Sequence, residues 1–107
     1  MDRKGATREK DIERYLVLGV KKLGGRAYKF TSPGNSGVPD RIVILPKARP
    51  IFVELKADYG KLSRIQEVQI NRLRELGQDV RVLYGMDSVR KFLDECRWAL
   101  EVMRDDI

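Results

Sequence analysis

Apolar positions recur at helical spacing in three segments of the chain. From about Thr7 to Leu23 they fall on one side at a spacing of about 3.6 residues, and Gly24-Gly25 ends this predicted helix. A second helix is predicted to open at Leu62-Ser63, and a third near Asp87-Ser88. The apolar face of the second is predicted to hold Ile65, Gln69, Leu73 and Leu76. That of the third is predicted to hold Val89, Phe92, Leu93, Cys96, Ala99, Leu100 and Met103.

Four shorter segments have the β-branched or alternating character of strands. They are Arg26–Thr31, Arg41–Leu45, Ile51–Lys56 and Asp79–Tyr84. Turn-forming residues fill 32–37 between the first two strands, so a loop is predicted there. The element order is therefore αβββαβα, an α/β fold with a central four-stranded mixed sheet flanked by helices. A chain of 107 residues is long enough for one core, so residues 1–107 are expected to form a single domain.

The composition narrows the classes of function. The chain has no histidine, which excludes imidazole-based zinc sites, Ser-His-Asp and Cys-His catalysis, and a histidine base. Twenty-two Lys and Arg against sixteen Asp and Glu give a net charge of +6, which favours a polyanionic partner, nucleic acid first. A domain with many solvated surface charges fits the same count. Cys96 is the only cysteine, which fits a reducing compartment, and no apolar run is long enough to predict a membrane span.

Acidic and basic side chains gather on the predicted hairpin. In the strand Ile51–Lys56, Glu54 and Lys56 point to the same side, about 7 Å apart. Strand pairing can bring Asp40 beside Glu54, and two close carboxylates raise each other's pKa unless a cation lies between them. These hard oxygen donors, with the backbone carbonyl of Leu55 as a third, suit Mg²⁺. Lys56 could then orient or deprotonate a water and offset charge on an attacked phosphate.

Each of these residues also has an ordinary interpretation. Glu54 and Lys56 could lie on a solvated strand face, and Asp40 could close a turn. Together with their neighbours, however, they form three motifs: Ser36-Gly37-Val38-Pro39-Asp40, then Val53-Glu54-Leu55-Lys56, then Gly60-Lys61-Leu62-Ser63-x-x-Gln66. This combination resembles the VRR-NUC domain family of the PD-(D/E)XK nuclease superfamily, over roughly Arg8 to Gly85.

The resemblance implies roles for four residues. Asp40 and Glu54 would bind a divalent metal, Mg²⁺ or Mn²⁺, Lys56 would assist catalysis, and Gln66 would belong to the active site. Gln66 has a competing interpretation, because Ser63 and Gln66 form a capping-box pattern. One amide is expected to reach either the helix backbone or the site, so the two roles are treated as alternatives.

Glu9 is a further candidate for the catalytic centre. Related Holliday-junction resolvases carry a glutamate near the start of the same helix, and residues 5–9 are similar to that segment. Helical geometry puts Glu9 about 40° from the middle of the apolar stripe and Glu13 about twice as far out, toward solvent. The alternative is that Glu9 only complements the helix dipole in the first turn.

The function implied by the resemblance is cleavage of structured DNA. We expect an endonuclease that hydrolyses phosphodiester bonds, with branched DNA as partner, acting as a junction-resolving homodimer in the cytoplasm of a bacterial or phage-infected cell. Flap or nicking activity, a non-catalytic DNA-binding module and a protein–protein adaptor are the alternatives. The predicted DNA contacts are Arg26, Lys29, Arg41, Lys61 and Arg64. Trp98 and Val102 point away from the core stripe of the last helix and form the predicted dimer interface, and Leu18 lies similarly on the first.

Overall fold

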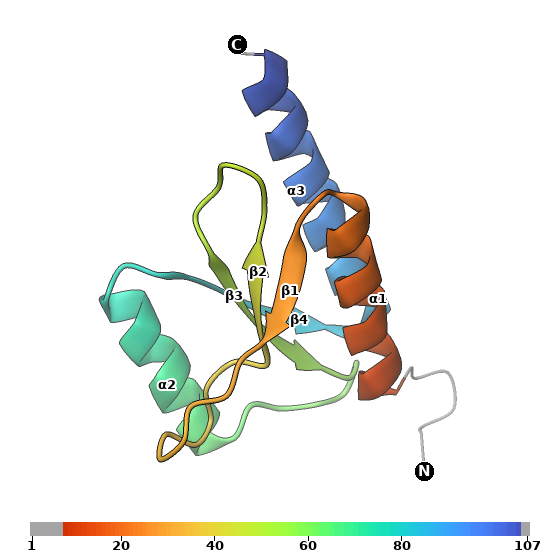
Figure 1. The fold of residues 1–107 in the computed structure, drawn as a ribbon. Coiled ribbons are helices and arrows are strands. Elements are labelled where there is room, and N and C mark those ends of the chain that lie inside the picture. The colour runs from red at the N-terminus through yellow and green to blue at the C-terminus, as the bar shows by residue number, and fades with distance from the viewer. Residues whose placement is uncertain (1–7, 106–107) are drawn as a thin grey trace.

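The helices and strands follow one another in the predicted order. The computed structural model describes residues 8–105. They form α1 (Glu9–Lys22), β1 (Arg26–Lys29), β2 (Arg41–Ile44), β3 (Ile51–Lys56), α2 (Arg64–Glu75), β4 (Asp79–Tyr84) and α3 (Gly85–Asp105) (Figure 1). The strands lie in the order β1-β2-β3-β4, in which β2 is antiparallel to both β1 and β3, and β3 is parallel to β4. The αβββαβα fold with a mixed sheet is thus confirmed.

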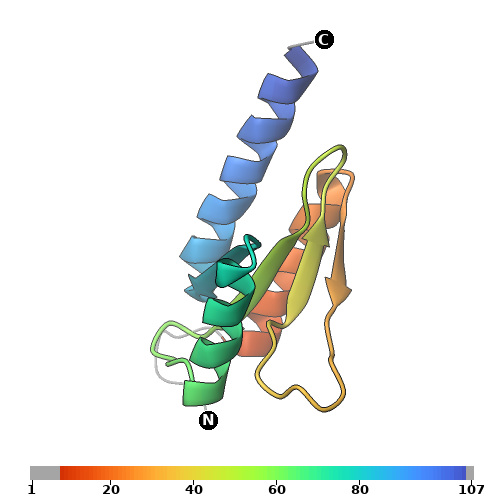
Figure 2. The same ribbon diagram turned by 90° about the vertical axis from the view of Figure 1, so that its left-hand side faces the viewer.

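The helices cover both faces of the sheet. α1 and α3 pack side by side on one face, and α2 lies against the other (Figures 1 and 2). The core lies under α1 and α3, where side chains from both helices and from the central strands are fully buried: Ile12, Leu16, Val20, Val43, Val53, Leu55 and Val89. Gly19 permits the close approach of these helices, since a Cβ there would lie 2.3 Å from the side chain of Leu93.

The predicted inner face of α2 is only partly correct, because Gln69 and Leu73 are half-buried but the other two predicted residues are exposed. Ile70 is its buried residue, whereas Ile65 is 48% exposed and Leu76 is 70% exposed. The half-buried positions beside Ile70 include Gln66 and Gln69. Polar residues therefore line much of the inner face, and apolar spacing alone could not locate it.

The C-terminal turns of α3 extend beyond the sheet (Figure 1). Ala99 and Met103, predicted in the core stripe, are exposed because no other described element covers this end of the helix. Trp98 is 66% exposed and Val102 is 37% exposed, in agreement with the predicted outward face. Among residues 8–105, no helix has the length and apolar character needed to cross a membrane.

Candidate active site

Strand pairing positions Asp40 beside the end of β3. Arg41, the first residue of β2, pairs with Val53 of β3. On the other side, the backbone carbonyl of Asp40 accepts a hydrogen bond of 3.0 Å from the N–H of Phe30, so the antiparallel pairing of β1 and β2 includes the residue before β2. Pro39 before it is buried and restricts the backbone. The Oδ2 atom of Asp40 accepts a hydrogen bond of 2.8 Å from the N–H of Leu55. Asp40 is therefore held against the strand that carries Glu54 and Lys56.

The carboxylate of Glu54 is buried. The residue is 1% exposed, so the alternative of a solvated strand face is wrong for Glu54. Its Oε2 atom accepts a hydrogen bond of 3.1 Å from Nε2 of Gln66 and lies 3.9 Å from Nζ of Lys56. Its Oε1 atom is buried and has no hydrogen-bond partner among the described residues. A buried carboxylate oxygen without a partner is costly, and the cost falls when a cation lies beside it.

Gln66 serves the helix cap and the site at once. Its Oε1 atom accepts a hydrogen bond of 2.8 Å from the N–H of Ser63, while the Ser63 hydroxyl oxygen accepts one of 3.2 Å from the N–H of Gln66. The NH₂ group at the other end of the same amide donates to Glu54. The expectation that the two roles exclude each other is therefore wrong, because the amide has an acceptor and a donor pointing in different directions.

The loop before Asp40 contributes to this arrangement. Gly37 has a φ of +86°, and a Cβ there would lie 2.8 Å from the carbonyl oxygen of Ile65 and 3.1 Å from the nitrogen of Gln66. The loop backbone thus packs directly against the first turn of α2. Only a residue without a side chain fits this contact and this φ.

Burial and like charge both act on the two carboxylates. Burial, followed by the charge of Asp40, raises the pKa of Glu54 from 4.5 to about 7, against an opposing effect of Lys56. Burial also raises the pKa of Asp40, with a smaller contribution from Glu13, while the hydrogen bond from Leu55 and the charges of Lys56 and Lys29 oppose it. Both shifts have the sign expected of buried carboxylates, and for Glu54 the like charge of Asp40 adds to the effect of burial.

The two glutamates of α1 differ from their predicted placement. Glu9 is exposed in the first turn of the helix, and its charge makes a small contribution to the raised pKa of Glu54. Glu13 was predicted to lie farther toward solvent, but its side chain is only 25% exposed and accepts a hydrogen bond of 2.8 Å from Nε of Arg41. The helical angle alone could not predict this burial, because the hydrogen bond from Arg41 holds the side chain of Glu13 toward the sheet.

The predicted DNA contacts fall into three groups. Lys61 and Arg64 are exposed at the start of α2, near Gln66, and the side chain of Lys29 is 68% exposed. Arg41 is 18% exposed and donates to Glu13 and to the carbonyl oxygen of Ala27, contacts that indicate a structural role. Arg26 lies at the far end of β1, about 10 Å along the strand from Lys29 and farther from the site.

The donors at this site fit a hard divalent cation. Within residues 8–105 no three His, Cys, Asp or Glu side chains gather as a metal-binding group. The side-chain ligands available to a cation at this site are therefore the two carboxylates of Asp40 and Glu54. The N–H and C=O of a strand residue point to the same edge, which puts the carbonyl of Leu55 on the side of Asp40. Mg²⁺ commonly binds through one or two carboxylates and completes its coordination with water and phosphate oxygens. The unpartnered Oε1 of Glu54 supplies the donor that such an ion needs.

Comparison with known proteins agrees on one family. The model of the VRR-NUC domain matches residues 19–87. "Putative nuclease p44" of Acyrthosiphon pisum secondary endosymbiont phage 1 is 51% identical over 80 residues, which cover 75% of this chain and 86% of the phage protein. A solved "VRR_NUC domain" superposes with a TM-score of 0.77 at 34% identity, covering 82% of this chain and 96% of that chain. A solved "VRR_NUC domain protein" shares the fold, with a TM-score of 0.67 at 19% identity and coverage of 83% and 87%.

Proposed function

The chain belongs to the VRR-NUC domain family, and from this premise we propose that it is a nuclease that hydrolyses phosphodiester bonds in DNA with a divalent cation, Mg²⁺ or Mn²⁺. The observation that carries the proposal is the buried, unpartnered Oε1 atom of Glu54 beside the carboxylate of Asp40. A protein gains nothing in stability from such a pair, so its presence indicates a site for a cation.

Each residue of the site has a distinct part in this proposal. Asp40, Glu54 and the carbonyl of Leu55 would hold the cation, which when bound supplies Lewis-acid stabilisation of charge on the phosphate. Gln66 keeps the Glu54 carboxylate in one orientation through its amide. Lys56, whose side chain is 15% exposed and lies beside Glu54, places an ammonium group where it can orient the attacking water and offset negative charge on the phosphate.

Cleavage assays with a labelled four-way junction, a flap and a linear duplex, with Mg²⁺ or with EDTA, test the proposal. Asp40→Ala should lose both cleavage and Mg²⁺ binding, because it removes one of two carboxylate ligands. Lys56→Ala should keep metal binding and lose about 10²-fold or more in rate, on the scale of one lost transition-state donor. Arg72→Ala, an exposed cation of α2, is the control. Cleavage in EDTA, or wild-type Mg²⁺ affinity of Asp40→Ala in calorimetry, would contradict the proposal.

The same assays separate the substrates. We propose that a homodimer cleaves junctions, since two symmetric cuts need two active sites. The exposed Trp98 and Val102 on the outer face of α3 are the proposed interface. Preferred cleavage of the flap or a single nick in the duplex would favour the alternative activities, and DNA binding without any cleavage would favour a non-catalytic module. The phage relative supports a bacterial or phage-infected cell as the setting.

A further inference from the structure

A basic surface follows the outer edge of β1 and the C-terminal end of α1. β1 is the first strand in the sheet order, so its outer edge has no partner strand among residues 8–105. Between this edge and α1 lies a hollow of about 240 Å³ whose lining contains four cations, Lys21, Arg26, Lys29 and Arg41, one exposed tyrosine, Tyr28, and no acidic residue. We refer to Lys21, Arg26, Tyr28 and Lys29 as the β1-edge surface.

The cations of the β1-edge surface are available for a ligand. Lys21 and Arg26 form no ion pair with any residue of the described part of the chain. Lys29 lies 4.0 Å from Glu13, at the limit of an ion pair, and its side chain is 68% exposed. Arg41 lines the hollow but is not part of the β1-edge surface, because its guanidinium group is bound to Glu13 and to the carbonyl of Ala27. A group of exposed cations of which two are unpaired attracts phosphates and releases their counterions.

The β1-edge surface leads away from the candidate active site. Lys29 pairs with Arg41, the residue after Asp40, and its charge reaches Asp40 because it lowers the pKa of that carboxyl. Arg26 lies three residues further along β1, about 10 Å away. The chain reverses at Gly24-Gly25, so Lys21 at the end of α1 lies beside the same hollow. A span of about 10 Å corresponds to about three base pairs of B-DNA, at about 3.4 Å each.

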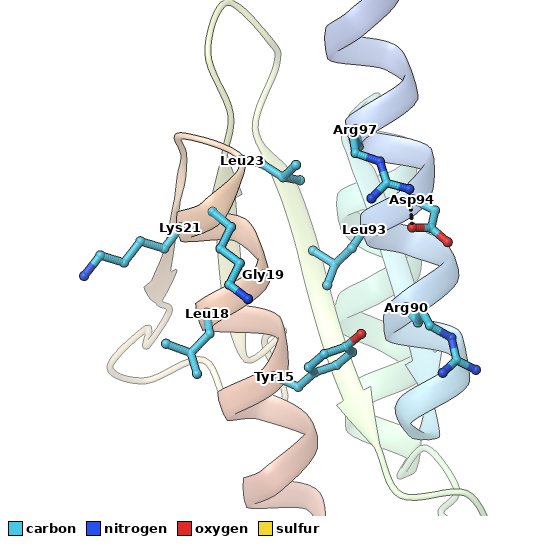
Figure 3. A pocket seen from close by; sticks show the side chains of 10 residues that line it. Tyr15, Leu18, Gly19, Lys21, Leu23, Arg90, Leu93, Asp94 and Arg97 are labelled. Atoms are coloured by element: carbon cyan, nitrogen blue, oxygen red, sulfur yellow. Dashed lines mark hydrogen bonds and ion pairs between the residues drawn. The ribbon is translucent and has the colours of Figure 1, made fainter.

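The larger hollow between α1 and α3 is a poorer match for phosphate. It has a volume of about 530 Å³ and contains the side chains of Tyr15, Leu18 and Leu93 (Figure 3). Of its two arginines, Arg97 is paired with Asp94, as Figure 3 shows, and Arg90 with Asp87. Lys21 and Lys22 of α1 also line this hollow, although the side chain of Lys21 points away from α3 in the same view. Apolar side chains and Asp94 thus share this lining with its cations, whereas the lining of the hollow beside β1 has no acidic residue.

We propose that the β1-edge surface binds the phosphate backbone of a double-stranded DNA segment that extends from the cleavage site. Lys21, Arg26 and Lys29 are the phosphate contacts, and the hydroxyl of Tyr28, 56% exposed between two of them, adds a hydrogen-bond donor. A single exposed aromatic is no stacking platform for a run of unpaired bases, which favours duplex over single-stranded DNA. The inference rests on the proposed nuclease function.

The test measures how the DNA affinity of a charge variant depends on salt. Lys21→Gln with Arg26→Gln removes the two cations farthest from the catalytic residues, and Arg72→Gln with Arg104→Gln removes two exposed cations from α2 and α3 as a control of equal charge. Binding of a labelled duplex and of a single strand is followed by fluorescence anisotropy in EDTA, between about 50 and 200 mM salt.

The proposal expects a specific change in slope. For duplex DNA, the plot of log affinity against log salt should become shallower by about 1.8 in the β1-edge variant, at about 0.9 per lost phosphate contact, and should change little in the control. Equal slopes for the two variants would overturn the inference, as would an equal loss of affinity for single-stranded DNA. Cleavage of DNA by the wild-type protein with Mg²⁺ is measured in parallel. If it cleaves while the slopes are equal, the nuclease proposal stands and the β1-edge proposal alone fails.

Discussion

Replacing Glu54 by glutamine should stabilise the protein when no divalent cation is present, although it changes the proposed active site. Glu54 is 1% exposed, and its pKa is raised from 4.5 to about 7 by burial and by the charge of Asp40. Because the folded chain holds this proton more tightly than the unfolded chain, ionising Glu54 costs folding free energy. The cost is absent below about pH 4.5, grows as the pH rises, and is complete above about pH 7.

The size of the effect follows from the pKa difference. A rise from 4.5 to about 7, at about 1.4 kcal/mol per pKa unit, makes ionised Glu54 cost about 3 kcal/mol. That is a large part of the roughly 5–15 kcal/mol by which a small domain is stable. Glutamine stays neutral with nearly the same shape, and its carbonyl can accept the hydrogen bond that Gln66 now donates at 3.1 Å. The attraction of Lys56, 3.9 Å away, already lowers this pKa, so its loss is included in the gain.

Urea unfolding in EDTA at pH 5 and pH 8 measures the effect. At pH 8 the midpoint of Glu54→Gln should lie above that of the wild type by roughly 1–3 M, for slopes on the order of 1–3 kcal/mol per molar urea. At pH 5 the two proteins should differ little. Glu101→Gln, at an exposed position of α3, should show no such dependence. Destabilisation of Glu54→Gln at pH 8, or the same difference at both pH values, would refute the reasoning.

Three other substitutions test the cap, the loop and the dimer. Gln66→Ala should lower stability by about 0.5–2 kcal/mol through loss of the cap and also slow cleavage, whereas Gln66→Glu should keep the stability at pH 5 and lose cleavage, as measured by thermal unfolding and nuclease assays. Gly37→Ala should cost about 1–3 kcal/mol more in urea unfolding than Gly34→Ala, because both have positive φ but only Gly37 packs against α2; equal costs would contradict this contact. Light scattering of the wild type should give about twice the 12.4 kDa chain mass, and Trp98→Glu should give a monomer; a wild-type monomer that cuts junctions at both strands would rule out the dimer.

The fold was predictable where turn-forming residues bracket the elements. β3 and β4 have the predicted bounds, and the register Arg41–Val53 brings Asp40 beside Glu54 as expected. The inner face of α2 was not predictable by apolar spacing, because half-buried glutamines flank its buried residue, Ile70. The exposed end of α3 was also missed, since its apolar spacing continues past the point where the sheet ends.

The surroundings of the candidate site could not be predicted from the sequence. A strand position such as Glu54 has the same sequence pattern whether a helix covers it or solvent does, so its burial could not be read from alternation. The pairing of Glu13 with Arg41 joins residues 28 positions apart, and no local spacing reveals it. The presence of an arginine directly after Asp40 and of a second glutamate one turn after Glu9 was the available signal.

Gln66 explains why the capping motif and the site motif occur in the same few residues. The cap fixes the first turn of α2 through Ser63, and the packing of Gly37 against that turn fixes its distance from the loop that ends at Asp40. The amide of Gln66, held in place in this way, donates the hydrogen bond that orients the carboxylate of Glu54. A glutamine is suited to this because it accepts from the helix backbone and donates to a carboxylate with one rigid group. Glutamate would satisfy the cap equally well, so the choice of glutamine over glutamate in this capping box is accounted for by the site and not by the helix.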